Sequence, residues 1–159
     1  MLLGFLAGQV GGDADSDWFR ALTKPAIYPP AATFPIVWSI LYAMTGFALA
    51  LVCAAWGARG RAVAIVAFAV QLALNLAWTP TFFGAHAIEA ALYLIAVILF
   101  FAILATAAMW RVRRWAGLLM LPYLAWVTFA LILNFQFLQL NPDGGADTEV
   151  SGAVERFEF

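Results

Sequence analysis

Charged side chains are scarce in this sequence. They make up 11% of its 159 residues, the formal net charge is −1, and the one basic cluster is Arg111, Arg113 and Arg114. Phosphate binding requires a much larger positive surface, so we expect no nucleic-acid partner. The expected membrane-embedded region is nearly free of ionisable groups, with Glu89 at an expected helix start and His86 in a turn. Ion channels and proton-coupled transporters need such groups along their path, which argues against both classes.

Cysteine and histidine are each present once. Cys53 cannot form an intramolecular disulfide, and in an apolar helix we interpret it as a small core residue. His86 has no second ligand beside it, so we interpret it as a solvated turn residue, with axial ligation of haem iron as the alternative. No nucleophile with an adjacent base, paired carboxylates or phosphate-binding loop is visible. We therefore predict no metal site, no hydrolytic activity and no required cofactor.

Apolar residues, in contrast, are abundant. They make up 65% of the chain, and the mean hydropathy is +0.93, far above the values of soluble domains. The apolar runs do not alternate with polar residues, which excludes a transmembrane β-barrel. A helix needs about 20 residues to cross the hydrocarbon core of a bilayer. We therefore predict an all-α integral membrane protein, a bundle of five transmembrane helices.

The whole bundle is expected to be one transmembrane domain over residues 1–141. We predict helices at about 1–13, 34–56, 62–83, 88–110 and 116–140, the first too short for a full span. Pro80 and Pro122 should bend the helices that contain them. Residues 142–159 form an acidic tail that we expect to be disordered.

A long loop at residues 14–33 separates the first two predicted helices. Prolines fix the backbone and restrict the residues before them, so the loop should be stiff rather than mobile. We predict an aromatic lid over one end of the bundle, formed around Lys24, Pro25, Tyr28, Pro29 and Pro30.

Basic residues are unequally divided between the two ends of the predicted bundle. The turns after the second and fourth predicted helices contain Arg59, Arg61, Arg111, Arg113 and Arg114. The other end and the tail contain Arg20, Lys24 and Arg156. By the positive-inside rule, the N-terminus and the Arg-rich turns face the cytoplasm if the protein lies in a bacterial inner membrane.

The predicted helix at 62–83 has two distinct faces. Gln71, Asn75 and Thr79 share a polar face. The residues Ala69, Ala73 and Ala77 share a face of small side chains about 200° away. Amides in a bilayer are costly unless paired, so the polar face should point inward, and the alanine face permits close contact with another helix. We predict a homodimer through the alanine face.

Seven tryptophans fall into two groups. Near predicted helix ends, where an interfacial belt is common, lie Trp18, Trp56, Trp110 and Trp115. Within helices, where an indole N–H must find a partner inside the protein, lie Trp38, Trp78 and Trp126. Together with the polar face, the second group predicts an aromatic cavity for a flat, largely apolar ligand. The alternative is that Gln71, Asn75 and Trp126 only hold neighbouring helices together.

Four stretches of the sequence resemble the tryptophan-rich sensory proteins and translocator proteins, also called peripheral-type benzodiazepine receptors (the TspO/MBR family). They are residues 18–25 with Pro29 and Pro30, residues 34–42, residues 71–84, and residues 116–126 continuing through Asn134 and Phe135. The resemblance implies a five-helix bundle, often dimeric, that binds porphyrins such as protoporphyrin IX, haem, and in some members sterols or drug-like ligands. It implies a tetrapyrrole sensor or carrier acting in a stress response.

Matched residue by residue, the resemblance implies a ligand site at Phe19, Trp38, Tyr42, Asn75, Trp126 and Ala130. Some bacterial members are reported to degrade protoporphyrin in light, which would make Trp38 and Trp126 the candidate catalytic residues. A third possibility is a structural membrane protein without a ligand.

The chain departs from the family's pattern in three respects, in the lid, in the sterol-recognition segment and in the first helix. Ile27 replaces the usual lid tryptophan, and Phe19 replaces the common tyrosine, which should weaken stacking and hydrogen bonding at the mouth of the cavity. The sterol-recognition pattern needs a tyrosine and a following base, whereas this chain has Phe135 and no base up to residue 141. This argues against sterol binding there. The first helix is also shorter than the family's.

Overall fold

A computed structural model describes residues 16–144 of the chain and contains helices and turns over that range. Its four long helices are α3 (Thr33–Cys53), α4 (Arg61–Thr79), α5 (Ile88–Val112) and α6 (Arg114–Leu140). The π-helical turn η1 (Pro80–Gly84) extends α4, and α2 (Asp17–Ala21) is a short helix. The four long helices are long and apolar enough to cross a membrane, which confirms an all-α membrane bundle. The predicted helix at 1–13 and the tail beyond 144 lie outside the described residues.

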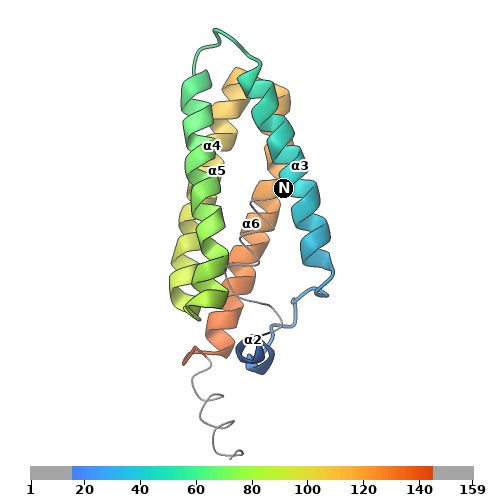
Figure 1. The fold of residues 1–159 in the computed structure, drawn as a ribbon, viewed down its shortest axis with the longest axis vertical. Helices are drawn as coiled ribbons and strands as arrows, with labels where there is room; N and C mark the ends of the chain where they lie inside the picture. Colours follow the sequence, from blue (N-terminus) through green and yellow to red (C-terminus); the bar gives the residue numbers. More distant parts are fainter. Residues whose placement is uncertain (1–15, 145–159) are drawn as a thin grey trace, which may run out of the picture.

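The long helices alternate in direction along the bundle (Figure 1). α5 packs against both α4 and α6, and α3 packs along α6. α3 leans away from α4 toward the end where α2 lies (Figure 1). The Arg-rich turns lie together at the opposite end, as predicted, because each follows a helix that runs in the same direction.

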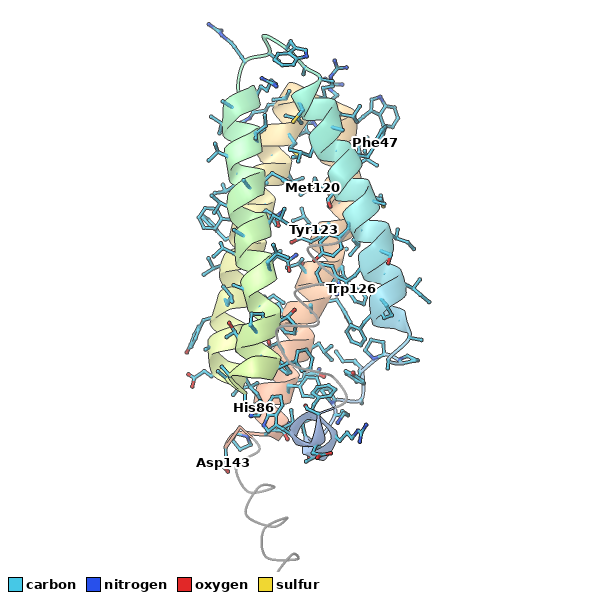
Figure 2. The ribbon with its side chains drawn as sticks, viewed as in Figure 1. Phe47, His86, Met120, Tyr123, Trp126 and Asp143 are labelled. Atoms are coloured by element: carbon cyan, nitrogen blue, oxygen red, sulfur yellow. The ribbon has the colours of Figure 1, made fainter. Side chains whose placement is uncertain are left out.

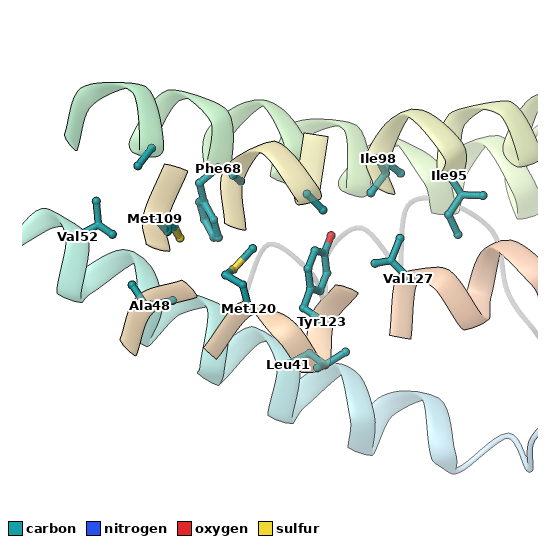
Figure 3. Close-up of a cluster of buried hydrophobic side chains, with 14 residues drawn as sticks. Leu41, Ala48, Val52, Phe68, Ile95, Ile98, Met109, Met120, Tyr123 and Val127 are labelled. Carbon is teal, nitrogen blue, oxygen red and sulfur yellow. The ribbon is translucent and has the colours of Figure 1, made fainter. Parts of the chain in front are cut away.

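Small side chains allow the helices to approach closely in the core (Figure 3). Ala48, Ala102 and Ala105 are fully buried beside Met109 and Met120, which fill the space between helices. At the turn between α5 and α6, a Cβ on Gly117 would lie 2.9 Å from the Cα of Trp110, so only glycine fits there. A second buried cluster, which includes Trp18, Phe82 and Phe137, lies at the lid end.

Helix boundaries differ from the predictions where turns intervene. The second predicted helix, 34–56, ends at Cys53, because Gly57 and Gly60 adopt positive φ and reverse the chain. The helices predicted at 88–110 and 116–140 extend to Val112 and begin at Arg114, so only Arg113 separates them. The helix assignment of α6 continues through Pro122.

The lid was predicted as a loop, but its first part is helical. The Ser16 hydroxyl accepts a hydrogen bond from the Phe19 backbone N–H at 3.3 Å and so caps α2. Trp18, predicted at the membrane interface, is instead buried, with only 7% of its surface exposed. The aromatic residues of α2 pack against the bundle end rather than facing lipid headgroups.

The alanine face of α4 points outward in the described structure. Ala69, Ala73 and Ala77 are all exposed. This orientation agrees with the sequence periodicity, and the homodimer stays a prediction.

Candidate functional site

A cavity of about 300 Å³ lies beneath the lid, where α3 has diverged from α4. The polar face of α4 and the lower halves of α3, α5 and α6 form its walls. It is lined by Phe19, Tyr28, Ala31, Phe34, Pro35, Trp38, Asn75, Trp78, Thr79, Phe82, Phe83, Ile95, Ile98, Trp126, Val127, Ala130, Leu133, Asn134 and Phe137. None of these lining side chains is charged, and nine carry aromatic rings. Such a wall suits a flat apolar ligand, because the aromatic rings can stack on the ligand and a few polar groups can orient it.

The lid (residues 16–32) closes the cavity with aromatic contacts. The Phe19 ring lies 5.2 Å from Phe83 and 5.8 Å from Phe137, centroid to centroid, and Tyr28 also contacts Phe137. Phe19 has only 4% of its surface exposed. The lid is therefore packed into the cavity end rather than lying loosely over it.

Lys24 holds the lid together from within. Its ammonium group donates hydrogen bonds to the carbonyls of Phe19, Arg20 and Leu22 and lies 4.6 Å from the centre of the Phe19 ring. These carbonyls belong to the end of α2, where a cation is favourable. Desolvation lowers the pKa of the Lys24 ammonium and raises the pKa of the Tyr28 hydroxyl, so Tyr28 stays neutral at the mouth. Lys24 thus serves the lid and does not line the cavity.

The segment after α6 fastens the lid to the bundle. Asn141 accepts a hydrogen bond from the Thr23 backbone N–H at 2.9 Å and donates one to the Thr23 carbonyl at 3.0 Å. The Trp18 indole N–H donates to the Gly144 carbonyl at 2.9 Å. We call these three hydrogen bonds the C-terminal clamp. They connect parts of the chain that are more than a hundred residues apart, and sequence reasoning missed them.

His86 lies at the lid end beside α2 (Figure 2). Its ring stacks on Trp18, with centroids 4.2 Å apart and planes 10° from parallel. His86 is exposed at a backbone φ of 53° and is not among the cavity-lining residues. The structure therefore places it in a turn outside the cavity.

Pro80 explains the shape of the wall at the end of α4. Proline has no N–H to continue the helical pattern, and the chain responds with a wider turn in which the Ala85 N–H bonds to the Pro80 carbonyl at 2.9 Å. The turn directs Phe82 inward, where it is 2% exposed and stacks on Trp78 at 5.1 Å. The proline within residues 79–83 indicates an irregular turn, but the direction in which the turn points Phe82 depends on packing.

The polar face of α4 is used in two ways. The Tyr123 hydroxyl donates to Gln71 Oε1 at 2.7 Å and accepts from Asn75 Nδ2 at 3.1 Å. Tyr123 projects from α6 into the bundle centre (Figures 2 and 3). Gln71 is 2% exposed and only joins helices, whereas Asn75 also lines the cavity. Of the two interpretations of this polar face, the tie between helices applies to Gln71, and the cavity wall applies to Asn75.

Five of the six predicted ligand residues line the cavity: Phe19, Trp38, Asn75, Trp126 and Ala130. The exception is Tyr42, which lies one turn beyond Trp38 on α3 and stacks on its ring at 5.3 Å. Of the five residues around which the lid was predicted, Tyr28 lines the cavity, whereas Lys24, Pro25, Pro29 and Pro30 are not among its lining residues. Sequence reasoning missed Phe82, Phe83, Asn134 and Phe137 as lining residues.

Trp126 separates two spaces. It lines the inner cavity, and it also borders an apolar groove on the outside of the bundle, between α3 and α6. Phe34 and Phe129 pack beside its ring. One indole therefore forms the partition between the cavity and this outer groove.

Comparison with known proteins identifies one family. The model of the TspO/MBR family matches residues 1–140. The chain is 42% identical to the tryptophan-rich protein TspO of Chlorobaculum tepidum over 89% of this chain and 90% of that protein. It is 40% identical to protein CrtK of Rhodobacter capsulatus over 79% of each chain. It is 36% identical to the human translocator protein over 74% of this chain and 71% of that protein.

Proposed function

The chain belongs to the TspO/MBR family of membrane proteins, and from this premise we propose that it binds tetrapyrroles such as protoporphyrin IX or haem in the cavity beneath its lid. The proposal includes similar flat hydrophobic molecules as ligands of the same cavity. The protein would act as a sensor or carrier of these molecules in a bacterial membrane. The name translocator protein, which several relatives carry, agrees with such a role.

The observation that supports this proposal is the aromatic, uncharged lining of the cavity. Trp38 and Trp126 offer ring faces to a planar ligand, and Asn75 supplies a polar contact between them. Carboxylates are costly in such a wall, so we place the ring system inside and the ligand's propionates at the lid end. In the membrane we place the Arg-rich turns in the cytoplasm and the lid on the other side.

A titration with protoporphyrin IX in detergent tests the proposal. We expect saturable quenching of tryptophan fluorescence and a shift of the porphyrin absorption band. Trp126→Phe and Asn75→Leu should each weaken binding about tenfold, the effect of losing roughly 1.4 kcal/mol of contact. Trp115→Phe is the matched control, because this side chain is 73% exposed at the Arg-rich end.

Unchanged affinity in both cavity variants would place the site elsewhere. Absence of binding, together with no ligand-dependent thermal shift, would favour a purely structural protein.

A second candidate function is light- and oxygen-dependent breakdown of the bound porphyrin. It is favoured by one observation, that two oxidisable indoles, Trp38 and Trp126, line the same cavity. The same titration, run dark and illuminated in air, separates the two functions. Breakdown requires that the porphyrin band be lost faster with the protein than with free tryptophan, and more slowly when both indoles become Phe.

A further inference from the structure

Two buried polar atoms of the cavity wall have no hydrogen-bond partner within the described residues. They are the indole nitrogen Nε1 of Trp78 and the amide oxygen Oδ1 of Asn134. Both residues line the cavity, and Asn134 is 2% exposed. Buried polar groups are nearly always paired in folded proteins, so two unpaired groups in one wall require an explanation.

The orientation of each group is fixed by its neighbours. Asn134 Nδ2 donates to the Ile88 carbonyl at 3.0 Å. A flipped amide would bring two oxygens together, so Oδ1 must be the atom left over. The Trp78 ring is held between Phe82, stacked at 5.1 Å, and Phe83, edge-on at 6.1 Å. The wall therefore contains one fixed, unpaired donor and one fixed, unpaired acceptor.

The other polar groups that line the cavity are the Asn75 amide and the hydroxyls of Tyr28 and Thr79. Asn75 Nδ2 donates to the Tyr123 hydroxyl, the two hydroxyls can rotate, and none of the described residues that line the cavity is charged. A ligand that leaves the Trp78 donor and the Asn134 acceptor unpaired gains only the contacts of its apolar body. A ligand that pairs them recovers two buried hydrogen bonds, which are worth more in an apolar site than in water.

We propose that Trp78 Nε1 and Asn134 Oδ1 form a donor–acceptor pair that determines the cavity's specificity. The pair selects flat aromatic ligands that are uncharged at the bound edge and carry both an acceptor and an N–H donor, as lactams and related nitrogen heterocycles do. This inference rests on the proposed function, because it requires that the cavity bind flat ligands at all.

Three small probes of similar shape test the pair. Naphthalene has neither polar group, 1-methyl-2-quinolone has the acceptor alone, and 2-quinolone has the acceptor and the N–H. Dissociation constants are measured by calorimetry in detergent for the wild type, Trp78→Phe and Asn134→Leu. Comparing variants for each probe cancels the partition of that probe into detergent.

Trp78→Phe should weaken binding of both quinolones about tenfold and leave naphthalene within about twofold, since one buried hydrogen bond is lost. Asn134→Leu should weaken 2-quinolone by a similar factor and leave the N-methyl probe unchanged. If Asn134→Leu does not fold, the binding of the two quinolones to the wild type still tests the proposal. After correction for measured detergent partition, it should bind 2-quinolone about tenfold more tightly than its N-methyl form.

Equal losses for all three probes in Trp78→Phe would overturn the proposal, because the indole would then act only as an apolar surface. Equal partition-corrected affinities of the wild type for the probes would also overturn it, since water would then satisfy both atoms. In either case protoporphyrin binding would survive, and the proposed function with it. Failure of protoporphyrin and all three probes to bind would instead reject the proposed function.

Discussion

Tyr123 hydrogen-bonds the polar face of α4 to α6. Its hydroxyl is both donor and acceptor, to Gln71 and from Asn75, in a segment where lipid offers no substitute partner. Removing the hydroxyl leaves the Gln71 carbonyl buried and unpaired. The residue is therefore a structural tie behind the cavity wall.

Tyr123→Phe should lower the free energy of unfolding by about 1–3 kcal/mol, the cost of an unsatisfied buried acceptor. Unfolding in mixed micelles, followed by circular dichroism, measures the change. Tyr93→Phe is the control, because the Tyr93 hydroxyl bonds to Glu89 on a side chain that is 64% exposed. Similar losses for the two variants would contradict the structural role of the Tyr123 hydroxyl.

The sequence indicated that Gln71 and Asn75 need partners, but it did not identify Tyr123. Their partner lies 52 and 48 residues away, and helical periodicity gives the face of one helix, not which helix it meets. Trp38 and Asn75 reached the cavity as expected because each faces inward by its own helix period. Tyr42 does not line the cavity, because it lies one turn further along α3, and its role in ligand binding stays a prediction.

At the level of elements, the lid and the C-terminal clamp form one unit. α2 has only five residues, too few to stand alone, and its buried aromatics depend on Phe82, Phe137 and the segment after α6. Closure of the cavity is thus coupled to Asn141 and Gly144, neither of which lines it.

Asn141→Leu should accelerate dissociation of protoporphyrin IX about tenfold, because it removes both hydrogen bonds to the Thr23 backbone. Stopped-flow displacement in detergent measures the rate. Asp143→Ala, an exposed change in the same segment, should leave the rate unchanged. An unaltered rate in Asn141→Leu would mean that the lid does not limit ligand release.

Two elements were not predicted from the sequence. α2 is too short for periodicity to indicate it, and its cap by Ser16 is a signal of one residue. Pro80 indicated a bend, but the π-helical turn that directs Phe82 inward is selected by packing against Trp78 and Trp18. Local sequence located these irregularities without giving their geometry.

At the scale of the whole molecule, composition and apolar periodicity were sufficient for the helical membrane bundle. They also placed the Arg-rich turns at one end, because these turns follow two helices that run in the same direction when consecutive helices alternate. What they could not give is the divergence of α3 from α4, which creates the cavity. The cavity is lined by side chains from all four long helices, and the period of a single helix does not indicate how the helices diverge.

The exposed alanine face of α4 leads to a prediction about assembly. Ala73→Phe should convert dimers to monomers on a sizing column in detergent, because a large side chain prevents close helix approach. Ala107→Phe, an exposed change on α5, is the control and should leave the assembly unchanged. A dimer that persists in Ala73→Phe would mean that another face of the bundle is used.

The C-terminal clamp also has a consequence for the order of synthesis. The lid leaves the ribosome before any of the four long helices, yet Asn141 and Gly144 follow the last of them. Asn141, the hydrogen-bond partner of Thr23, is therefore synthesised 118 residues after Thr23. The C-terminal clamp can therefore form only after all four long helices have been synthesised.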